Sequence, residues 1–241
     1  MGSNGSGSPM MRGFSAGLKN VVGFNPQEVK TSYFIIMNAI MDILGDMKHL
    51  FERQQWYFRD TWASPEGVTY CEKLAKEENI FLRTEAVKLN NITKTVRDAA
   101  IKWSIATGYY DMEHDLPADD FAINFIDVNP PIESCVMPDK NGVVGCDPER
   151  LKDAGKYIYS DAMYNDVLSG ISRAKRSVDR CGFVGANQLN NLKQQVDNLL
   201  NAFKSKVDSI ADEVNKKAVE IANKYTLSAE QVAQTFRNMN I

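Results

Sequence analysis

The sequence predicts an all-α fold in which two long antiparallel helical hairpins form an elongated four-helix bundle, with an irregular central linker and a short C-terminal helix. Two observations carry this prediction. Apolar residues recur at spacings of three and four over long stretches, which is the period of one helix face. A capped helix start, an amphipathic stretch, an aromatic-x-small turn and a second stretch also occur twice, about 121 residues apart. Unrelated hairpins would rarely match so closely, so the chain is interpreted as a tandem of two.

The first hairpin is marked by capping residues at its helix ends. Asn25 precedes a proline and can accept hydrogen bonds from the first helical turn, so it is expected to start a helix that runs to about Thr61. Ser64 starts the second helix in the same way, and Gly108 ends it. The positions expected on the apolar faces are Val29, Tyr33, Ile36, Met37, Ile40, Leu44, Met47 and Phe51, then Cys71, Leu74, Phe81, Val87, Ile92, Val96 and Trp103.

The second hairpin starts at Asp147-Pro148, and its first helix is expected to continue to about Arg180. Its second helix has the most regular apolar stripe of the chain, with coiled-coil-like spacing and no internal glycine or proline. The sequence Ser228-Ala229-Glu230-Gln231 has the pattern of a capping box and predicts a separate short terminal helix. The stripe consists of Leu189, Leu192, Val196, Leu199, Phe203, Val207, Ile210, Val214, Ala218, Ile221 and Tyr225, and the ring of Phe203 is expected to be fully buried.

The segments outside the hairpins are irregular in sequence. Helical periodicity disappears over residues 109–146, where prolines and glycines are frequent, so this stretch is expected to be a linker. Alternating apolar residues over 121–128 predict that part of the linker packs along the helices. Residues 1–11 have the composition of a tag or a disordered start. The first hairpin is therefore assigned to 12–108, and the second, with its short terminal helix, to 147–241.

Charge and hydropathy argue against two classes of partner. The chain has 28 basic and 31 acidic residues and a net charge of −3, so no dense positive face for nucleic acid is expected. The most apolar run, Tyr33 to Leu44, is interrupted by Asn38 and Asp42 and is too short for stable membrane insertion. A conventional secretory signal peptide is not expected either, because the residues before the first helix lack a sustained apolar run.

The sequence lacks the residue sets that catalysis requires, so no enzyme activity, cofactor or metal is expected. The two histidines are His49, expected on a helix surface, and His114, which lies among acidic residues. A metal site that combines His114 with Asp119 or Asp120 is the weaker interpretation of an acidic loop. No nucleophile-elbow, phosphate-loop or dinucleotide-binding pattern occurs.

The cysteines leave two interpretations open. Cys135 and Cys146 flank a turn that would allow them to form a disulfide. The alternative is that all four cysteines are free thiols in a reducing compartment.

The first hairpin turn, Trp62-Ala63-Ser64, resembles the turn of the WXG family, whose helical hairpins are exported by type VII (ESX) secretion systems. The second turn, Phe183-Val184-Gly185, keeps the glycine and replaces the tryptophan with another aromatic residue. A small residue favours tight reversal of the chain, and a large ring covers the open end of the hairpin. Trp62, Ser64, Phe183 and Gly185 are therefore the predicted hairpin-turn residues.

A second motif is similar to the export signal of this family, Tyr-x-x-x-Asp/Glu just past the second helix of a hairpin. Tyr109 and Glu113 match it here, where the first hairpin is expected to end. At positions i and i+4 of a helical extension, a ring and a carboxylate would share one face. The alternative is that Tyr109 packs the end of the bundle while Glu113 is solvated.

The resemblance implies a non-enzymatic protein, secreted without a conventional signal peptide, that acts as an effector, carrier or binding partner. Its expected partners are proteins, either the secretion machinery or another helical protein. Internal pairing of the two hairpins implies a monomer, with a dimer as the alternative. Two other functions remain open at this point: a structural helical component of a virion or an intracellular scaffold, and a membrane-active helical toxin.

Overall fold

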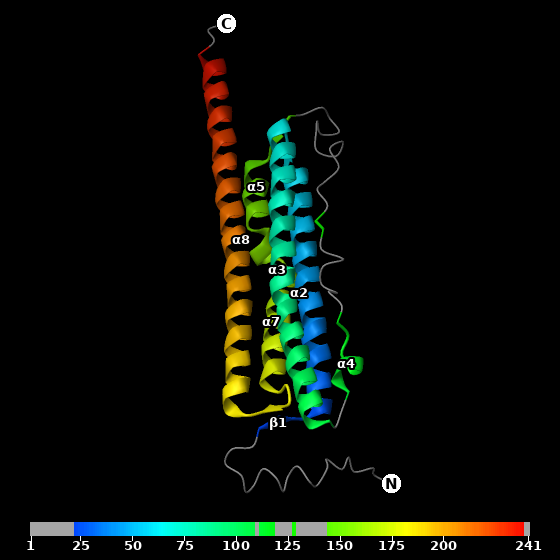
Figure 1. The fold of residues 1–241 in the computed structure, drawn as a ribbon. Coiled ribbons are helices and arrows are strands. Elements are labelled where there is room, and N and C mark those ends of the chain that lie inside the picture. The colour runs from blue at the N-terminus through cyan, green and yellow to red at the C-terminus, as the bar shows by residue number, and fades with distance from the viewer. Residues whose placement is uncertain (1–21, 109–110, 119–126, 129–143, 239–241) are drawn as a thin grey trace, which may run out of the picture.

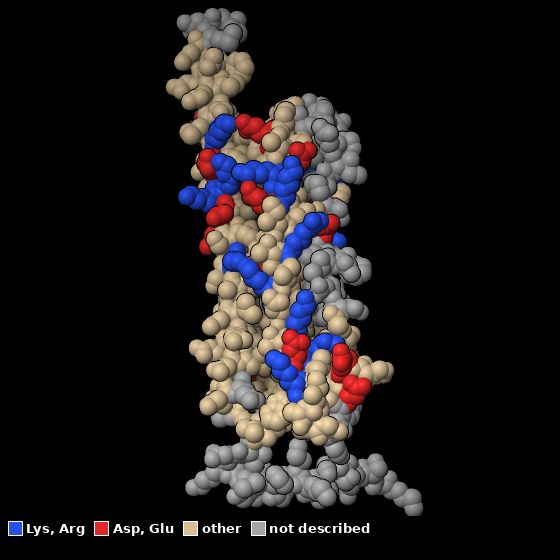
Figure 2. Space-filling view, viewed as in Figure 1, with Lys and Arg blue, Asp and Glu red and all other residues tan. Residues whose placement is uncertain are grey.

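The computed structural model describes residues 22–108, 111–118, 127–128 and 144–238. Helices make up most of this part of the chain, so the predicted all-α class is confirmed. The long helices lie side by side along one axis, and the end of α8 (Ala186–Arg237) extends beyond the others (Figure 1). Basic and acidic side chains are interleaved over the face shown in Figure 2.

The first hairpin consists of α2 (Pro26–Thr61) and α3 (Pro65–Thr107), with the predicted residues at its helix ends. The Asn25 side chain accepts hydrogen bonds from two backbone N–H groups of the first turn, at 3.1 and 3.3 Å. Ser64 caps α3, and Gly108 ends it in the left-handed region, with a φ of 61°. The predicted start and end of both helices are confirmed.

The first helix of the second hairpin was predicted as one element, and this prediction is wrong. It is divided into α5 (Pro148–Gly155), α6 (Tyr157–Ser160) and α7 (Ala162–Asp179). The break allows the chain to change its packing partner, because α5 packs mainly against α8 and α7 packs mainly against α2. A glycine allows close approach at both contacts. A Cβ added at Gly155 of α5 would lie 2.6 Å from the Cβ of Ala218 in α8, and one added at Gly170 of α7 would lie 2.7 Å from Cγ1 of Ile43 in α2.

Asp161 fixes the second break, between α6 and α7. Its backbone is extended, and its carboxylate accepts a hydrogen bond from the N–H of Met163 at 2.8 Å, which starts α7 as an N-cap. The same carboxylate accepts from the Tyr157 hydroxyl at 2.5 Å and from the Arg53 guanidinium of α2 at 3.2 Å. Two local contacts and one contact with a distant helix therefore meet at the residue that interrupts the helix.

The predicted separate helix at the C-terminus is also wrong, because α8 continues through it to Arg237. The Ser228 hydroxyl donates to the carbonyl of Lys224 at 3.0 Å, and Thr226 donates to Ala222 at 3.1 Å. These hydroxyls are thus satisfied by the preceding turn and do not cap a new helix. Three large apolar side chains on this projecting end are exposed: Leu227, Val232 and Phe236.

Two clusters of buried apolar residues form along the helices. The larger, the main core, fills most of the length, and Phe203 is fully buried in it, as predicted. The predicted apolar faces are largely confirmed, but Val87 is 51% exposed because Leu82, Ala86 and Leu89 occupy the inward side of α3. The smaller cluster, the end core, consists of Phe58, Trp62, Cys71, Leu74, Leu151, Ala154, Val214, Ala218, Ile221 and Ala222.

The described parts of the linker lie against the first hairpin. The Tyr33 hydroxyl donates to the carbonyl of Pro117 at 2.6 Å, and Arg97 Nε donates to Leu116 at 2.9 Å. Farther along, the Asn79 side chain holds both backbone groups of Val128, at 2.6 and 3.0 Å. The predicted packing of residues 121–128 is therefore seen at Val128, whereas 121–126 lie outside the described residues.

Candidate functional site

The first hairpin turn places Trp62 at the junction of both halves of the chain. Its ring is 3% exposed and lies 5.8 Å from the ring of Tyr70 in α3. The indole N–H donates to the Tyr225 hydroxyl of α8 at 3.2 Å. The tryptophan therefore closes the end of its own hairpin and also contacts the last helix of the second one.

Ser64 and Gly67 make the tight turn after the tryptophan possible. The Ser64 hydroxyl is buried and accepts a hydrogen bond from the Gly67 N–H at 3.0 Å, so its main role is to cap α3. A Cβ at Gly67 would lie 2.8 Å from the Trp62 carbonyl oxygen and 3.1 Å from its ring. The glycine that the tryptophan requires is thus Gly67, which sequence reasoning missed although it is a glycine in the first turn of a helix.

The second hairpin turn has a buried ring flanked by two glycines. Phe183 is 8% exposed, while Gly182 and Gly185 adopt positive φ angles of 75° and 136°, which favour glycine. A Cβ at Gly182 would also lie 2.7 Å from the Cβ of Glu28 at the start of α2. The turn is therefore built for close approach to the first hairpin.

Two short antiparallel strand pairs, which the sequence did not predict, join each turn to the other hairpin. β1 (Gly23–Phe24) pairs with β4 (Phe183–Val184), and β2 (Trp62–Ala63) pairs with β3 (Gly145–Cys146). The two pairs have equivalent registers in the two copies of the repeat. The aromatic residue of each turn, Phe183 or Trp62, lies opposite the second residue of its partner strand, Phe24 or Cys146.

A backbone hydrogen bond accompanies each strand pair. The N–H of Asn25 donates to Gly182 at 2.8 Å, and the N–H of Asp147 donates to Thr61 at 2.9 Å. Each hairpin turn is thus completed by the segment that precedes the first helix of the other hairpin.

The segment that carries the predicted export motif forms the one-turn helix α4 (Met112–Asp115). Met112 is buried in the main core, and Asp111 accepts a hydrogen bond from the N–H of His114 at 3.3 Å. Glu113 is exposed on this turn. Tyr109 lies outside the described residues, so a shared face for Tyr109 and Glu113 remains a prediction.

The cysteines and histidines show no reactive arrangement in the described part of the chain. Cys146 is a free cysteine, so the predicted disulfide with Cys135, which lies outside the described residues, is not seen. Burial raises the pKa of the Cys146 thiol to about 11. His49 lies 3.4 Å from Glu52 on the surface of α2, and His114 is largely exposed. No group of three or more potential metal ligands occurs among the described residues, which do not include Asp119 and Asp120.

A layer of buried polar side chains separates the main core from the end core, and sequence reasoning missed it. Gln54, Gln55 and Glu78 are almost fully buried, although they lie between apolar turns. The Gln54 amide donates to the carbonyl of Ala154 in α5 at 3.2 Å, and the Gln55 amide donates to the Glu78 carboxyl. The sequence did contain a signal, because Glu78 lies at the helical spacing between Leu74 and Phe81, on the face predicted to be apolar.

This polar layer contains acceptors that have no partner. Among the described residues, four buried oxygens lack a hydrogen bond, and each costs about 1–3 kcal/mol if it stays unsatisfied. Such groups in a folded protein require an explanation, for example a ligand or a water molecule. Three of the four atoms belong to this layer, namely Gln54 Oε1, Gln55 Oε1 and Glu78 Oε1, and the fourth is Asn215 Oδ1 of α8.

Comparisons with protein-family models, curated proteins and solved structures give no match for this chain. Among the helices that the structure describes, none combines the length and apolar character that crossing a bilayer requires.

Proposed function

We propose that this chain is a tandem protein of WXG type, whose two hairpins complete one four-helix bundle. In this proposal it is not an enzyme; it is exported by a type VII-like secretion system and acts as an effector, carrier or binding partner. The single observation that supports it best is the reciprocal strand pairing, β1 with β4 and β2 with β3.

The reciprocal pairing supports the proposal because it is the arrangement expected of two mated hairpins. Trp62 and Phe183 are buried at the two turns, and each turn pairs with the segment that precedes the other hairpin. With the two hairpins fused in one chain, each hairpin would receive from the other the contacts that a separate subunit would otherwise provide. The proposal therefore includes a monomer with the linker over 109–146 between its hairpins.

The export signal is the part of the proposal that can be tested directly. Glu113 is exposed just past the first hairpin, and Glu149 provides a matched control as an exposed acidic residue in the first turn of a helix of the second hairpin. We expect Glu113→Gln and Tyr109→Ala each to reduce the secreted fraction strongly in a host with a type VII system. Glu149→Gln should be exported like the unaltered protein.

The measurement is the ratio of secreted to cellular protein by immunoblot, with circular dichroism of each purified variant to verify folding. Equal export of Glu113→Gln and Glu149→Gln would remove the signal from the proposal. Complete retention of the unaltered protein in such a host would contradict export itself and favour a structural role.

A further inference from the structure

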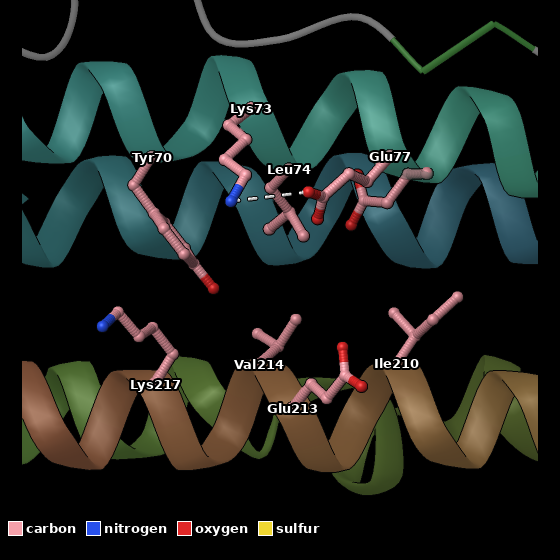
Figure 3. A pocket seen from close by; sticks show the side chains of 9 residues that line it. Tyr70, Lys73, Leu74, Glu77, Ile210, Glu213, Val214 and Lys217 are labelled. Carbon is pink, nitrogen blue, oxygen red and sulfur yellow. Dashed lines mark ion pairs between the residues drawn. The ribbon is translucent and has the colours of Figure 1, made fainter.

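A groove of about 420 Å³ lies between α3 and α8, over the polar layer. Tyr70, Lys73 and Glu77 on α3 face Glu213 and Lys217 on α8 across this groove (Figure 3). Its walls also include apolar side chains from both helices, namely Leu74, Ile210 and Val214. The groove therefore combines a surface for an aliphatic chain with several charged groups.

Glu78 lines this groove and has no basic partner among the residues that the structure describes. It is 1% exposed, and one carboxyl oxygen accepts a hydrogen bond from Gln55, while Oε1 has no partner. The lysines of the groove pair with other carboxylates, Lys73 with Glu77 at 3.6 Å and Lys217 with Glu220 at 3.0 Å. A buried carboxyl beside an open groove is thus left without a counter-ion.

Glu85 lies seven residues farther along the same face of α3, and there the fold provides lysine partners for the buried carboxylate. Its buried carboxylate contacts the ammonium groups of Lys206 on α8 at 2.5 Å and Lys88 at 2.8 Å. Because α3 and α8 run antiparallel, moving one heptad toward the end core brings Glu78 opposite Glu213. The residue of α8 that corresponds to Lys206 is therefore a glutamate, Glu213, so α8 supplies no ammonium to Glu78.

We propose that the α3–α8 groove binds a primary alkylammonium, which takes the place that Lys206 has at Glu85. Because Oε1 is buried, the Glu78 side chain would turn toward the groove on binding. The ammonium would then donate to Oε1 and interact with Glu213, and its methylene chain would lie on Leu74, Ile210 and Val214. This inference is independent of the WXG proposal, since it depends only on the geometry of the groove.

The electrostatics of Glu78 agree with this ligand class. Burial raises its pKa well above the ordinary value, with a further contribution from Glu77, and the hydrogen bond from Gln55 opposes that effect only in part. A cation beside Glu78 would favour the ionised carboxylate. With Glu78 ionised, the three carboxylates and two lysines that line the groove leave one negative charge, which one ammonium group would balance.

The test is calorimetric titration of the full chain with 1,4-diaminobutane, with the neutral isostere 1,4-butanediol as control ligand. We expect the diamine to bind and the diol not to bind. Glu78→Gln should weaken binding about tenfold or more, because it replaces the charged acceptor with a neutral amide of the same shape. Glu72→Gln, an exposed position of α3 outside the groove, should bind like the unaltered protein.

Glu213→Lys provides a second variant with an opposite expected effect on stability. Its new ammonium should occupy the site, abolish diamine binding and raise the melting temperature, as Lys206 stabilises Glu85. A titration with Nα-acetyl-lysine N-methylamide tests whether the ammonium comes from a free amine or from a lysine of a partner protein. Tighter binding of 1,4-diaminobutane indicates a free amine, and tighter binding of the lysine derivative indicates a protein lysine. Three results would overturn the proposal: no binding of either amine, equal binding by Glu78→Gln, or Mg²⁺ binding with the same dependence on Glu78.

Discussion

Two buried glutamates on the same face of α3 have opposite electrostatic environments. Burial alone would raise the pKa of Glu85, but hydrogen bonds from Lys206 and Lys88 lower it below the ordinary value. Glu78 has no such partners, so burial raises its pKa. Only one of these carboxyl groups is therefore stabilised in its charged form by the fold.

Glu78 should make the stability of the protein fall as pH rises. The folded state retains the proton of Glu78 above pH 4.5, where the unfolded chain releases it, so unfolding is increasingly favoured over that range. The effect of one such group is at most about 1.4 kcal/mol per pH unit. Glu78→Gln should have nearly the stability of the unaltered protein at pH 4 and become relatively more stable at pH 6 and 8.

Urea unfolding of both proteins at the three pH values measures this difference, and Glu72→Gln serves as the exposed control. A constant difference between Glu78→Gln and the unaltered protein from pH 4 to 8 would show that Glu78 titrates alike in both states.

Phe203 should be one of the most sensitive core positions. Its ring is fully buried and stacks on Phe81 of α3 at 5.6 Å, which links the second helices of the two hairpins. Phe203→Ala should lower the free energy of unfolding by about 3–5 kcal/mol, because transfer energy is lost and a cavity remains. Phe236→Ala, on the projecting end of α8, should change it by about 0.5 kcal/mol or less. Denaturant unfolding measures both, and similar losses for the two variants would contradict the assigned core.

At the scale of elements, the sequence predicted what local interactions determine. Asn25 and Ser64 cap their helices by contacts within one turn, and Gly108 ends a helix through its own backbone conformation. The break at Asp161 combines local contacts, with Met163 and Tyr157, and a contact with Arg53 of α2, more than a hundred residues away, which the helical period of the sequence does not reveal. The capping box at Ser228 was a plausible local signal, but its hydroxyl is satisfied within the continuous helix.

The candidate sites follow the same division. Trp62 and Phe183 were predicted from the turn motif as residues whose rings cover the ends of the hairpins, and both residues are buried. The contact of Trp62 with Tyr225, and the groove at Glu78, depend on the register of α8 against the first hairpin. Periodicity gives the face of a helix but not which residue of a distant helix lies opposite it.

At the scale of the whole molecule, the contacts between the two hairpins are as extensive as those within them. α7 packs mainly against α2, although the two helices belong to different hairpins. The strand pairs and the end core also combine residues from both halves. Each half alone would expose the apolar surface that it buries against the other.

The two hairpins should therefore fold as one cooperative unit. We expect residues 12–116 and 140–241, expressed separately, to aggregate or to lack a sharp unfolding transition, and to form a soluble complex when they are coexpressed. The physical reason is that α2 loses the cover of α7, and both turns lose their paired strands. Calorimetry and size-exclusion chromatography measure the two properties. If each fragment is a soluble monomer with its own sharp transition, each hairpin is a domain that folds independently, and the single-bundle proposal is wrong.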